Sequence, residues 1–276
     1  MTPKEKHAIQ ALRQSLIARN RFDSRIHHDS RLVKFLRARS LHVELAEKKL
    51  IQADEWKESF NVQEIIDNFI FEEVWDVYKV FPAYWHKTDR AGRPILIQST
   101  KYLSLQHLLS ATTEERLIKN HIFELEKTEN YRFKACSVKH KSNVQTICQI
   151  IDVEGVTMYQ FNEIRNALTS VSNITSSYYP DCLGKCVVIN APKYFTVIWS
   201  IVKLMLDPRT ISKVTILGSD YQKFLLKYID PKHLPVEYGG ECDCEGGCGN
   251  KLDIGPWNDG SVEGFPIERW ERAYNK

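Results

Sequence analysis

The sequence predicts an α/β protein in which a mainly parallel sheet with flanking helices follows a small all-α N-terminal lobe. Apolar residues up to Asn61 recur at intervals of three and four, which is typical of amphipathic helices. Beyond that point, segments rich in β-branched residues alternate with helical segments, and turns containing proline and glycine separate some of them. Because alternating strands and helices favour parallel pairing, we expect one mainly parallel sheet.

The N-terminal lobe is expected over residues 1–79. Its three predicted helices present apolar faces made by Ile9, Leu12, Leu16 and Ile17, by Leu32, Phe35 and Leu36, and by positions within Val43–Phe60. Residues 61–79 are interpreted as a connecting segment. Phe81-Pro82 marks a break, because proline lacks a backbone donor, so the second domain is expected to begin near Val80.

The second domain is expected over residues 80–257, with a C-terminal tail over residues 258–276. Turn residues from His86 to Pro94, followed by a short strand at Ile95, predict a hairpin. The chain then alternates between helix and strand over residues 112–131, 144–153, 161–177 and 187–190, with Thr113 as the cap of the first helix.

An unusually apolar segment, Phe195 to Leu206, lies between Pro192 and Pro208. It has room for roughly three helical turns, and its apolar residues fall on all sides. Such a helix must be buried on most sides or be in contact with lipid. No run reaches the roughly 20 apolar residues that span a bilayer, and the N-terminus lacks the apolar stretch of a secretory signal. We therefore expect a reducing, cytosolic environment.

Charge and motifs exclude several functions. The 38 lysines and arginines nearly balance 35 aspartates and glutamates, which argues against nucleic acid as a partner. The sequence contains no Gly-x-Ser-x-Gly elbow, phosphate-binding Gly-x4-Gly-Lys loop, His-Glu-x-x-His pair or Cys-x5-Arg loop. We therefore expect no enzyme activity, no catalytic residue and no cofactor.

Seven cysteines fall into two groups. Four are scattered through predicted elements and are expected to be buried thiols, namely Cys136, Cys148, Cys182 and Cys186. Cys242, Cys244 and Cys248 form a C-x-C-x3-C cluster that could hold zinc with a fourth donor such as Asp243 or Glu245. Because no fourth ligand is obvious, the sequence favours a structural loop, and we predict no metal site.

Four phrases occur in an order that resembles a known family, namely KFLRARSLHVELAEKKLIQADEW, YYPDCLGK, VVINAP and LDPRTISKVTILGS. From roughly Arg31 to Trp257 the chain resembles CRAL-TRIO lipid-binding proteins, in particular the fungal-type phosphatidylinositol transfer proteins. The resemblance implies a lipid pocket, and phosphatidylinositol transfer between cytosolic membrane faces for phosphoinositide synthesis. It also implies transient contact with Golgi or endosomal membranes, a phosphatidylinositol kinase as partner, and a monomer that carries phospholipid.

The resemblance also implies a headgroup site made by Arg39, Asp181, Thr210 and Lys213. Lys213 and Thr210 would supply a charge and a hydroxyl to phosphate. Asp181 would accept hydrogen bonds from sugar hydroxyls, and Arg39 would neutralise phosphate or pair with Asp181. Aspartate is shorter than the glutamate usual there, and Ser40 stands where the family often has a basic residue.

The apolar segment matches the family's gate helix, with acyl-chain positions at Phe195, Ile198, Trp199, Val202, Met205 and Leu206. The hydroxyls that hold phosphatidylcholine in this family fall at Ile147 and Gln149, and neither residue reproduces them. Three interpretations therefore stay open: phosphatidylinositol alone or with a second lipid, a different cargo such as a sterol, or a lipid-sensing regulatory module that does not transfer lipid.

Overall fold

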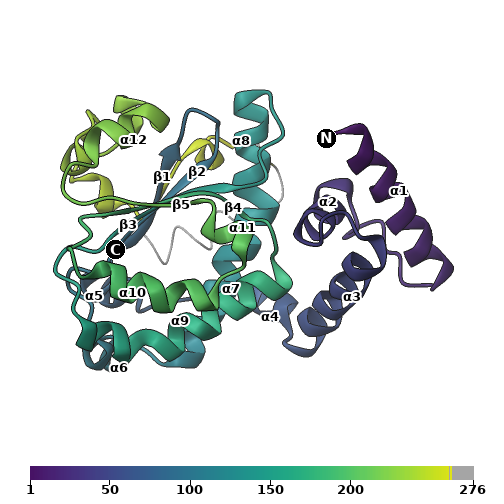
Figure 1. The fold of residues 1–276 in the computed structure, drawn as a ribbon, viewed down its shortest axis with the longest axis horizontal. Coiled ribbons are helices and arrows are strands. Elements are labelled where there is room, and N and C mark those ends of the chain that lie inside the picture. The colour runs from purple at the N-terminus through teal and green to yellow at the C-terminus, as the bar shows by residue number, and fades with distance from the viewer. Residues whose placement is uncertain (261, 263–276) are drawn as a thin grey trace. The chain divides into compact units, whose positions relative to one another are not determined.

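The structure is a computed structural model that describes residues 1–260 and 262, and within them the chain forms two compact units (Figure 1). The helical unit contains residues 1–68 and 171–182, and the remaining described residues form the α/β unit. The boundary predicted near Val80 stays a prediction. Of the predicted tail, residues 261 and 263–276 lie outside the described residues.

The helical unit is built from amphipathic helices around one apolar core. Its elements are α1 (Pro3–Ala18), α2 (Asp29–Ala38), α3 (Val43–Ser59), α4 (Val62–Asn68) and the last turns of α9 (Met158–Tyr178). Leu12, Leu16 and Leu32 are fully buried, as their spacing predicts. Ile17 was expected on the same face, but its side chain is 56% exposed. One residue further along a helix is rotated by about 100°, which carries Ile17 away from the core.

The segment interpreted as a connection between lobe and domain, residues 61–79, contains two helices. They are α4 and α5 (Val74–Val80), each seven residues long. Val62 and Ile65 are buried in α4, and Val77 is buried in α5. Such short segments rich in β-branched and aromatic residues have weak helical preference, and burial of one face in the folded chain stabilises them.

The α/β unit contains a six-stranded sheet in the order β5-β4-β3-β2-β1-β6. Its strands are β1 (Ala83–Thr88), β2 (Pro94–Ser99), β3 (Ile147–Asp152), β4 (Leu183–Ile189), β5 (Val214–Ile216) and β6 (Asp253–Ile254). β1 and β2 pair antiparallel, and the other neighbouring strands pair parallel. The predicted hairpin and the mainly parallel sheet are therefore confirmed.

Helices cover both faces of this sheet (Figure 1). The apolar residues of the two faces are buried to different extents. One face packs against α12 (Gln222–Tyr228), where Ile95, Ile150 and Ile189 are completely buried. The other face lies under α9 and α10 (Phe195–Val202), and many of its apolar residues are only partly buried. Further helices of this unit are α6 (Leu105–Ala111), α7 (Glu114–Lys127), α8 (Phe133–His140) and α11 (Pro208–Ile211).

The helix predicted over residues 112–131 begins as expected and continues further. The Thr113 side chain accepts a hydrogen bond from the Arg116 backbone N–H at 3.3 Å, which confirms it as the cap of α7. After α7, a π-helical turn at Thr128–Arg132 leads directly into α8.

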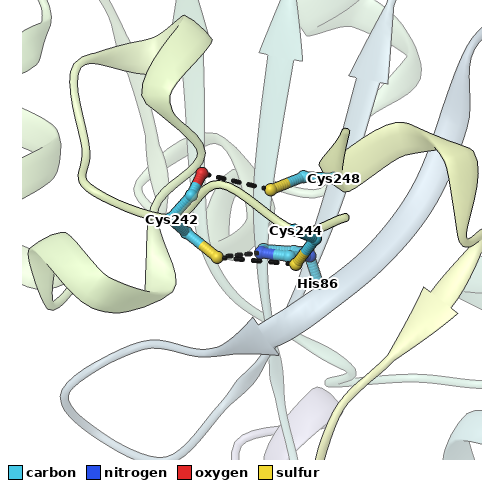
Figure 2. A group of neighbouring side chains, drawn as sticks. All are labelled: His86, Cys242, Cys244 and Cys248. Carbon is cyan, nitrogen blue, oxygen red and sulfur yellow. Dashed lines mark hydrogen bonds between the residues drawn. The ribbon is translucent and has the colours of Figure 1, made fainter. Parts of the chain in front are cut away.

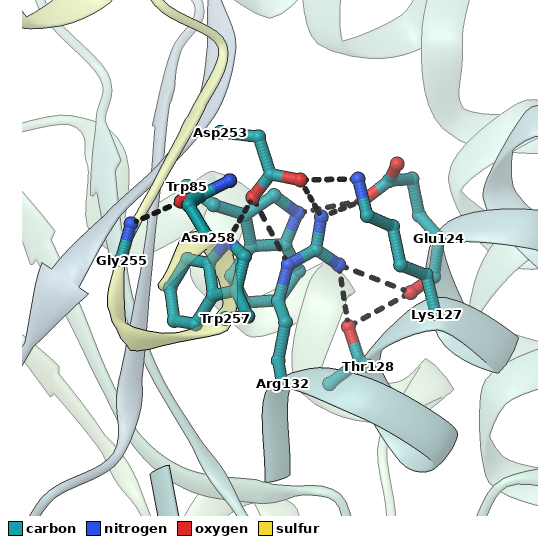
Figure 3. A network of polar contacts seen from close by, with 9 residues as sticks. All are labelled: Trp85, Glu124, Lys127, Thr128, Arg132, Asp253, Gly255, Trp257 and Asn258. Atoms are coloured by element: carbon teal, nitrogen blue, oxygen red, sulfur yellow. Dashed lines mark hydrogen bonds and ion pairs between the residues drawn. The ribbon is translucent and has the colours of Figure 1, made fainter. Parts of the chain in front are cut away.

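The π-helical turn places the completely buried Arg132 in a polar network (Figure 3). The Arg132 guanidinium lies 4.1 Å from the Trp85 ring centroid and 5.6 Å from that of Trp257. It donates two hydrogen bonds to Asp253, at 3.2 Å from Nε and 2.9 Å from Nη2. Lys127 also pairs with Asp253. The network therefore ties the C-terminal strand β6 to the helical run through α7 and α8.

The four scattered cysteines are buried thiols outside any disulfide, as predicted. Cys136 packs with Trp85 and Phe133, and Cys186 packs on the sheet face under α10. Across residues 1–260 and 262, no helix is both long enough and apolar enough to cross a membrane.

Candidate functional site

The apolar segment forms helix α10 followed by a 3₁₀ turn at Lys203–Met205, so the expected helix is present. Phe195 and Ile198 are buried on its inner side and pack with residues such as Val188 of β4. Trp199 and Val202 are partly buried and pack against the same cluster of apolar residues. This side of α10 therefore covers the sheet face formed by β3, β4 and β5.

The outer side of this segment is open to solvent. The Val197 side chain is 52% exposed and that of Leu204 is 86% exposed. Met205 and Leu206 are half-buried, and the Met205 sulfur accepts a hydrogen bond from Thr169 of α9 at 3.5 Å. Contact with acyl chains stays a prediction for the six gate-helix positions, namely Phe195, Ile198, Trp199, Val202, Met205 and Leu206.

Strand β3 places Ile147 and Gln149 on the same face of the sheet as the cluster under α10, but Ile147 itself packs against the neighbouring cluster that contains Trp85 and Phe133. Residues alternate along this strand, with Ile147, Gln149 and Ile151 half-buried on one side. Gln149 is in register with Cys186, which packs in the same cluster as Phe195. The Gln149 amide donates a hydrogen bond to Gln98 of β2 at 2.6 Å, so this side chain is already partnered.

The face under α10 is apolar but incompletely buried. The partly buried apolar residues of this cluster include Ile151, Leu183, Val214 and Ile216 on the strands, with Met158 of α9 and Ile201 of α10 packed against them. Along the 21 residues of α9, Phe161 is the one residue recorded as buried. Apolar surface that the protein itself does not fully bury gains stability when an apolar ligand covers it. The arrangement therefore suits binding of a hydrophobic molecule.

Thr210 and Lys213 lie on a single turn that leads into β5. Asp207 caps α11 by accepting a hydrogen bond from the Arg209 N–H at 2.8 Å. The Lys213 N–H donates to the Thr210 carbonyl at 3.0 Å, and the Lys213 carbonyl accepts from Cys186 of β4 at 3.0 Å. Both side chains are half-buried. A hydroxyl and an ammonium held on one turn can bind a phosphate.

Arg39 and Asp181 both belong to the helical unit. Arg39 ends α2, and its guanidinium donates to the Ala38 carbonyl at 2.9 Å. Asp181 has a positive φ of 55°, a conformation that aspartate tolerates better than most residues. Its carboxylate lies 3.9 Å from the Arg37 guanidinium.

Arg37 was missed by the sequence reasoning, although it lies two positions before Arg39 in the same basic stretch. Arg37 also donates to Glu5 at 2.8 Å. This hydrogen bond lowers the pKa of Glu5 to about 2. Arg37 therefore joins α1 to the segment that carries Asp181, and it is an additional candidate for neutralising an anion.

The C-terminal cysteines meet a residue that the sequence did not suggest (Figure 2). One potential ligand atom from each of His86, Cys242, Cys244 and Cys248 lies within 4.8 Å of the others. Asp243 and Glu245, the acidic donors considered from the sequence, are not in this group. Burial lowers the pKa of His86 to about 4 and raises the pKa of Cys248 to about 12.

The fold and this apolar face define a class of α/β protein suited to hydrophobic ligands, and comparison with known proteins gives the family. Residues 78–240 match the model of the CRAL/TRIO domain, so the chain belongs to this family. The expected family and fold class are therefore confirmed.

Curated relatives match nearly the whole chain. The SEC14 cytosolic factor of Kluyveromyces lactis is 39% identical over 254 residues, covering 91% of this chain and 82% of that protein. The Sec14 cytosolic factor of Schizosaccharomyces pombe is 37% identical over 231 residues, covering 84% and 80%. The phosphatidylinositol/phosphatidylcholine transfer protein SFH11 of Arabidopsis thaliana is 35% identical over 265 residues, covering 95% and 70%.

A solved structure shares the fold. The crystal structure of Sfh5 superposes with a TM-score of 0.70 at 19% identity and covers 92% of each chain. At that identity, the likeness supports the fold alone.

Proposed function

We propose that this protein binds phosphatidylinositol and transfers it between membranes, presenting the lipid for phosphoinositide synthesis. The observation that carries the proposal is the half-buried apolar sheet face under α10. An acyl chain placed there would gain roughly 0.8 kcal/mol for each buried methylene, so the apolar lining would supply most of the affinity. Family membership and the relatives' names support the same function.

In this proposal, Thr210 and Lys213 bind the headgroup phosphate. Arg39 neutralises the phosphate charge, and Asp181 accepts hydrogen bonds from the sugar hydroxyls. The chemistry of the turn before β5 supports the first pair, because its backbone is fixed by hydrogen bonds to β4 and within the turn. Arg37 supports the second pair, because its guanidinium lies 3.9 Å from the Asp181 carboxylate.

The proposal favours phosphatidylinositol over phosphatidylcholine. The named relatives include transfer proteins for both lipids. Here, however, Gln149 is engaged by Gln98, and the Ile147 side chain has no polar group. A choline lipid would therefore lack the hydroxyl donors that the family resemblance associates with these positions. A second cargo, if one is carried, would be a more apolar molecule such as a sterol.

We further propose that the protein is a monomer that acts at cytosolic faces of Golgi or endosomal membranes and delivers lipid to a phosphatidylinositol kinase. In this proposal it catalyses no reaction, needs no cofactor and binds no nucleic acid. The name cytosolic factor, carried by several relatives, supports the cytosolic part of this proposal. Co-purification with a kinase and fractionation of the protein from cells test these points directly.

Replacing both Thr210 and Lys213 by alanine is expected to lower phosphatidylinositol transfer between vesicles by tenfold or more. Removing a hydrogen bond to a charged group loses about 1.5–3 kcal/mol, and about 1.4 kcal/mol corresponds to a factor of ten. The measurement follows labelled phosphatidylinositol and phosphatidylcholine from donor to acceptor vesicles. Thermal unfolding of the same double variant checks that the fold is kept.

The exposed Lys223→Ala variant is the control for loss of one positive charge. Unchanged phosphatidylinositol transfer in the double variant would remove these residues from the headgroup site. A wild-type protein that binds phosphatidylinositol without transferring it would instead be a lipid-sensing module. Absence of both binding and transfer would overturn the proposed function, and mass spectrometry of extracted ligand would then identify the cargo.

A further inference from the structure

His86 and the three C-terminal cysteines place one potential ligand atom each in a compact cluster, in which all four atoms lie within 4.8 Å of one another (Figure 2). His86 Nε2 lies 3.4 Å from the Cys242 sulfur, and the sulfurs of Cys242 and Cys244 are 3.7 Å apart. Zinc bonds of about 2.3 Å to sulfur and about 2.0–2.1 Å to nitrogen give tetrahedral edges of about 3.8 Å between sulfurs and about 3.6 Å between sulfur and nitrogen. The two measured separations are close to these edges.

An irregularity in β1 directs two consecutive residues toward the cysteine cluster. The register of the β1–β2 pair shifts between Trp85 and Thr88, and Lys87 has a positive φ of 53°. In a regular strand, His86 and Lys87 would point to opposite faces. Here His86 and Lys87 both contact the Cys242 sulfur, Lys87 through its ammonium at 2.9 Å. A bulge of this kind re-aims side chains and is common beside functional sites.

The cysteine loop is held in place by its backbone. Cys242 donates to the Leu234 carbonyl at 3.0 Å, and its own carbonyl accepts from Val236 at 3.1 Å. Gly246 and Gly247 have φ values of 79° and 97°, which side chains other than glycine rarely adopt. This turn brings Cys248 back, so that its thiol donates to the Cys242 carbonyl at 3.3 Å.

A positively charged side chain beside the four donors would balance the net negative charge of a zinc ion bound to three thiolates. Three thiolates and one Zn²⁺ carry a net charge of −1, and the Lys87 ammonium beside Cys242 balances it. Lys87 is itself fixed by donating to the Lys232 carbonyl at 2.9 Å. Second-sphere partners of this kind orient the ligands and tune the metal.

His86 has an arrangement that a metal would explain. The residue is completely buried, and Nδ1 has no hydrogen-bond partner among the described residues. Its Nε2 faces the Cys242 sulfur at 3.4 Å. Nε2 is the nitrogen that faces the thiols, so a metal would bond there and replace this weak nitrogen–sulfur contact, while Nδ1 would carry the ring proton.

We propose that His86, Cys242, Cys244 and Cys248 bind one zinc ion. Thiolate and imidazole donors in tetrahedral geometry favour zinc over magnesium or calcium, which prefer oxygen ligands. Four protein ligands leave no open position, which is typical of a structural site. The ion would tie strand β1 to the loop that leads into β6, so its role is stability of the α/β unit and is independent of lipid transfer.

The test measures zinc in the 276-residue chain purified under reducing conditions without chelator. We expect about one zinc per chain in the wild type and in Cys136→Ala, and loss of zinc in Cys244→Ala and His86→Ala. Cys136→Ala is the matched control, because it removes a buried free thiol outside this group. Cys244 is the only half-exposed member of the group, so its truncation perturbs packing least.

Two further readouts separate metal binding from a folding defect. Cobalt added to the metal-free protein is expected to give the intense visible absorption of a tetrahedral site with thiolate charge-transfer bands, in the wild type but not in Cys244→Ala. Chelator is expected to lower the melting temperature of the wild type and to leave that of Cys244→Ala unchanged. A wild-type protein that holds no zinc and gives no tetrahedral cobalt spectrum would overturn the proposal, as would full zinc content in Cys244→Ala.

Discussion

Replacing Arg132 by methionine is expected to destabilise the α/β unit by about 3–5 kcal/mol, the usual effect of removing one partner from a buried ion pair. The guanidinium is completely buried, and its loss leaves the Asp253 carboxylate with Lys127 as its remaining cationic partner. Glu124 would also lose an ion pair of 2.8 Å. Methionine keeps much of the side-chain volume, so the effect measured is mainly electrostatic.

Urea unfolding followed by tryptophan fluorescence measures this change, because Trp85 and Trp257 flank the guanidinium (Figure 3). The exposed Arg209→Met variant is the control and is expected to change stability by less than about 0.5 kcal/mol. If Arg132→Met lost less than about 1 kcal/mol, the network would be no more important than a surface salt bridge.

The same network predicts a dependence of stability on acid. Burial alone would raise the pKa of Asp253, but the charges of Arg132 and Lys127 outweigh it and hold the pKa below its usual range. A carboxyl whose pKa is depressed by folding contributes stability above its unfolded pKa, and loses it as the pH falls through the folded value. Asp253→Asn is therefore expected to flatten the fall in stability on acidification, and an unchanged pH profile would contradict this assignment.

The hydrophobic pattern within a segment was enough to predict those helices and strands that have a regular apolar or β-branched sequence. Strands β2, β3 and β4 are rich in β-branched residues, and the N-terminal helices have regular apolar faces, so these elements were found. The short helices α4 and α5, the three-residue strand β5 and the two-residue strand β6 were not found, because packing against distant segments stabilises them. Propensity alone is weak over such short lengths.

In the candidate sites too, the sequence predicts the proximity of residues that are close along the chain, but not of residues that are far apart along it. Thr210 and Lys213 share one turn, so their proximity follows from the sequence. His86 and Cys242 are separated by 156 positions, and only the pairing of β1 with β6 and the bulge at Lys87 place them together. No spacing rule connects a histidine to ligands so far along the chain, and the sequence therefore showed three donors without the fourth.

Replacing Val197 and Leu204 together by aspartate is expected to reduce binding to phospholipid vesicles by about a hundredfold. Both side chains lie on the open side of the α10 segment, at 52% and 86% exposure. Burying each apolar side chain in a membrane interface would contribute about 1.5–3 kcal/mol, so losing two removes about 3 kcal/mol or more. This prediction depends on the proposed function, in which the exposed side of α10 meets the membrane.

Vesicle co-sedimentation measures the change, and phosphatidylinositol transfer is expected to fall in parallel. Val138→Asp is the control for an aspartate placed on another exposed apolar position, because Val138 is 60% exposed on α8, and each single variant, Val197→Asp and Leu204→Asp, is compared with it at equal charge. Both variants are expected to unfold at the wild-type temperature, since none of the three residues is buried. Equal loss of binding in Val138→Asp would point to general charge repulsion, whereas unchanged binding in the double variant would place the membrane contact elsewhere on the protein. A selective loss would identify the open side of α10 and the 3₁₀ turn after it as the surface that contacts the membrane.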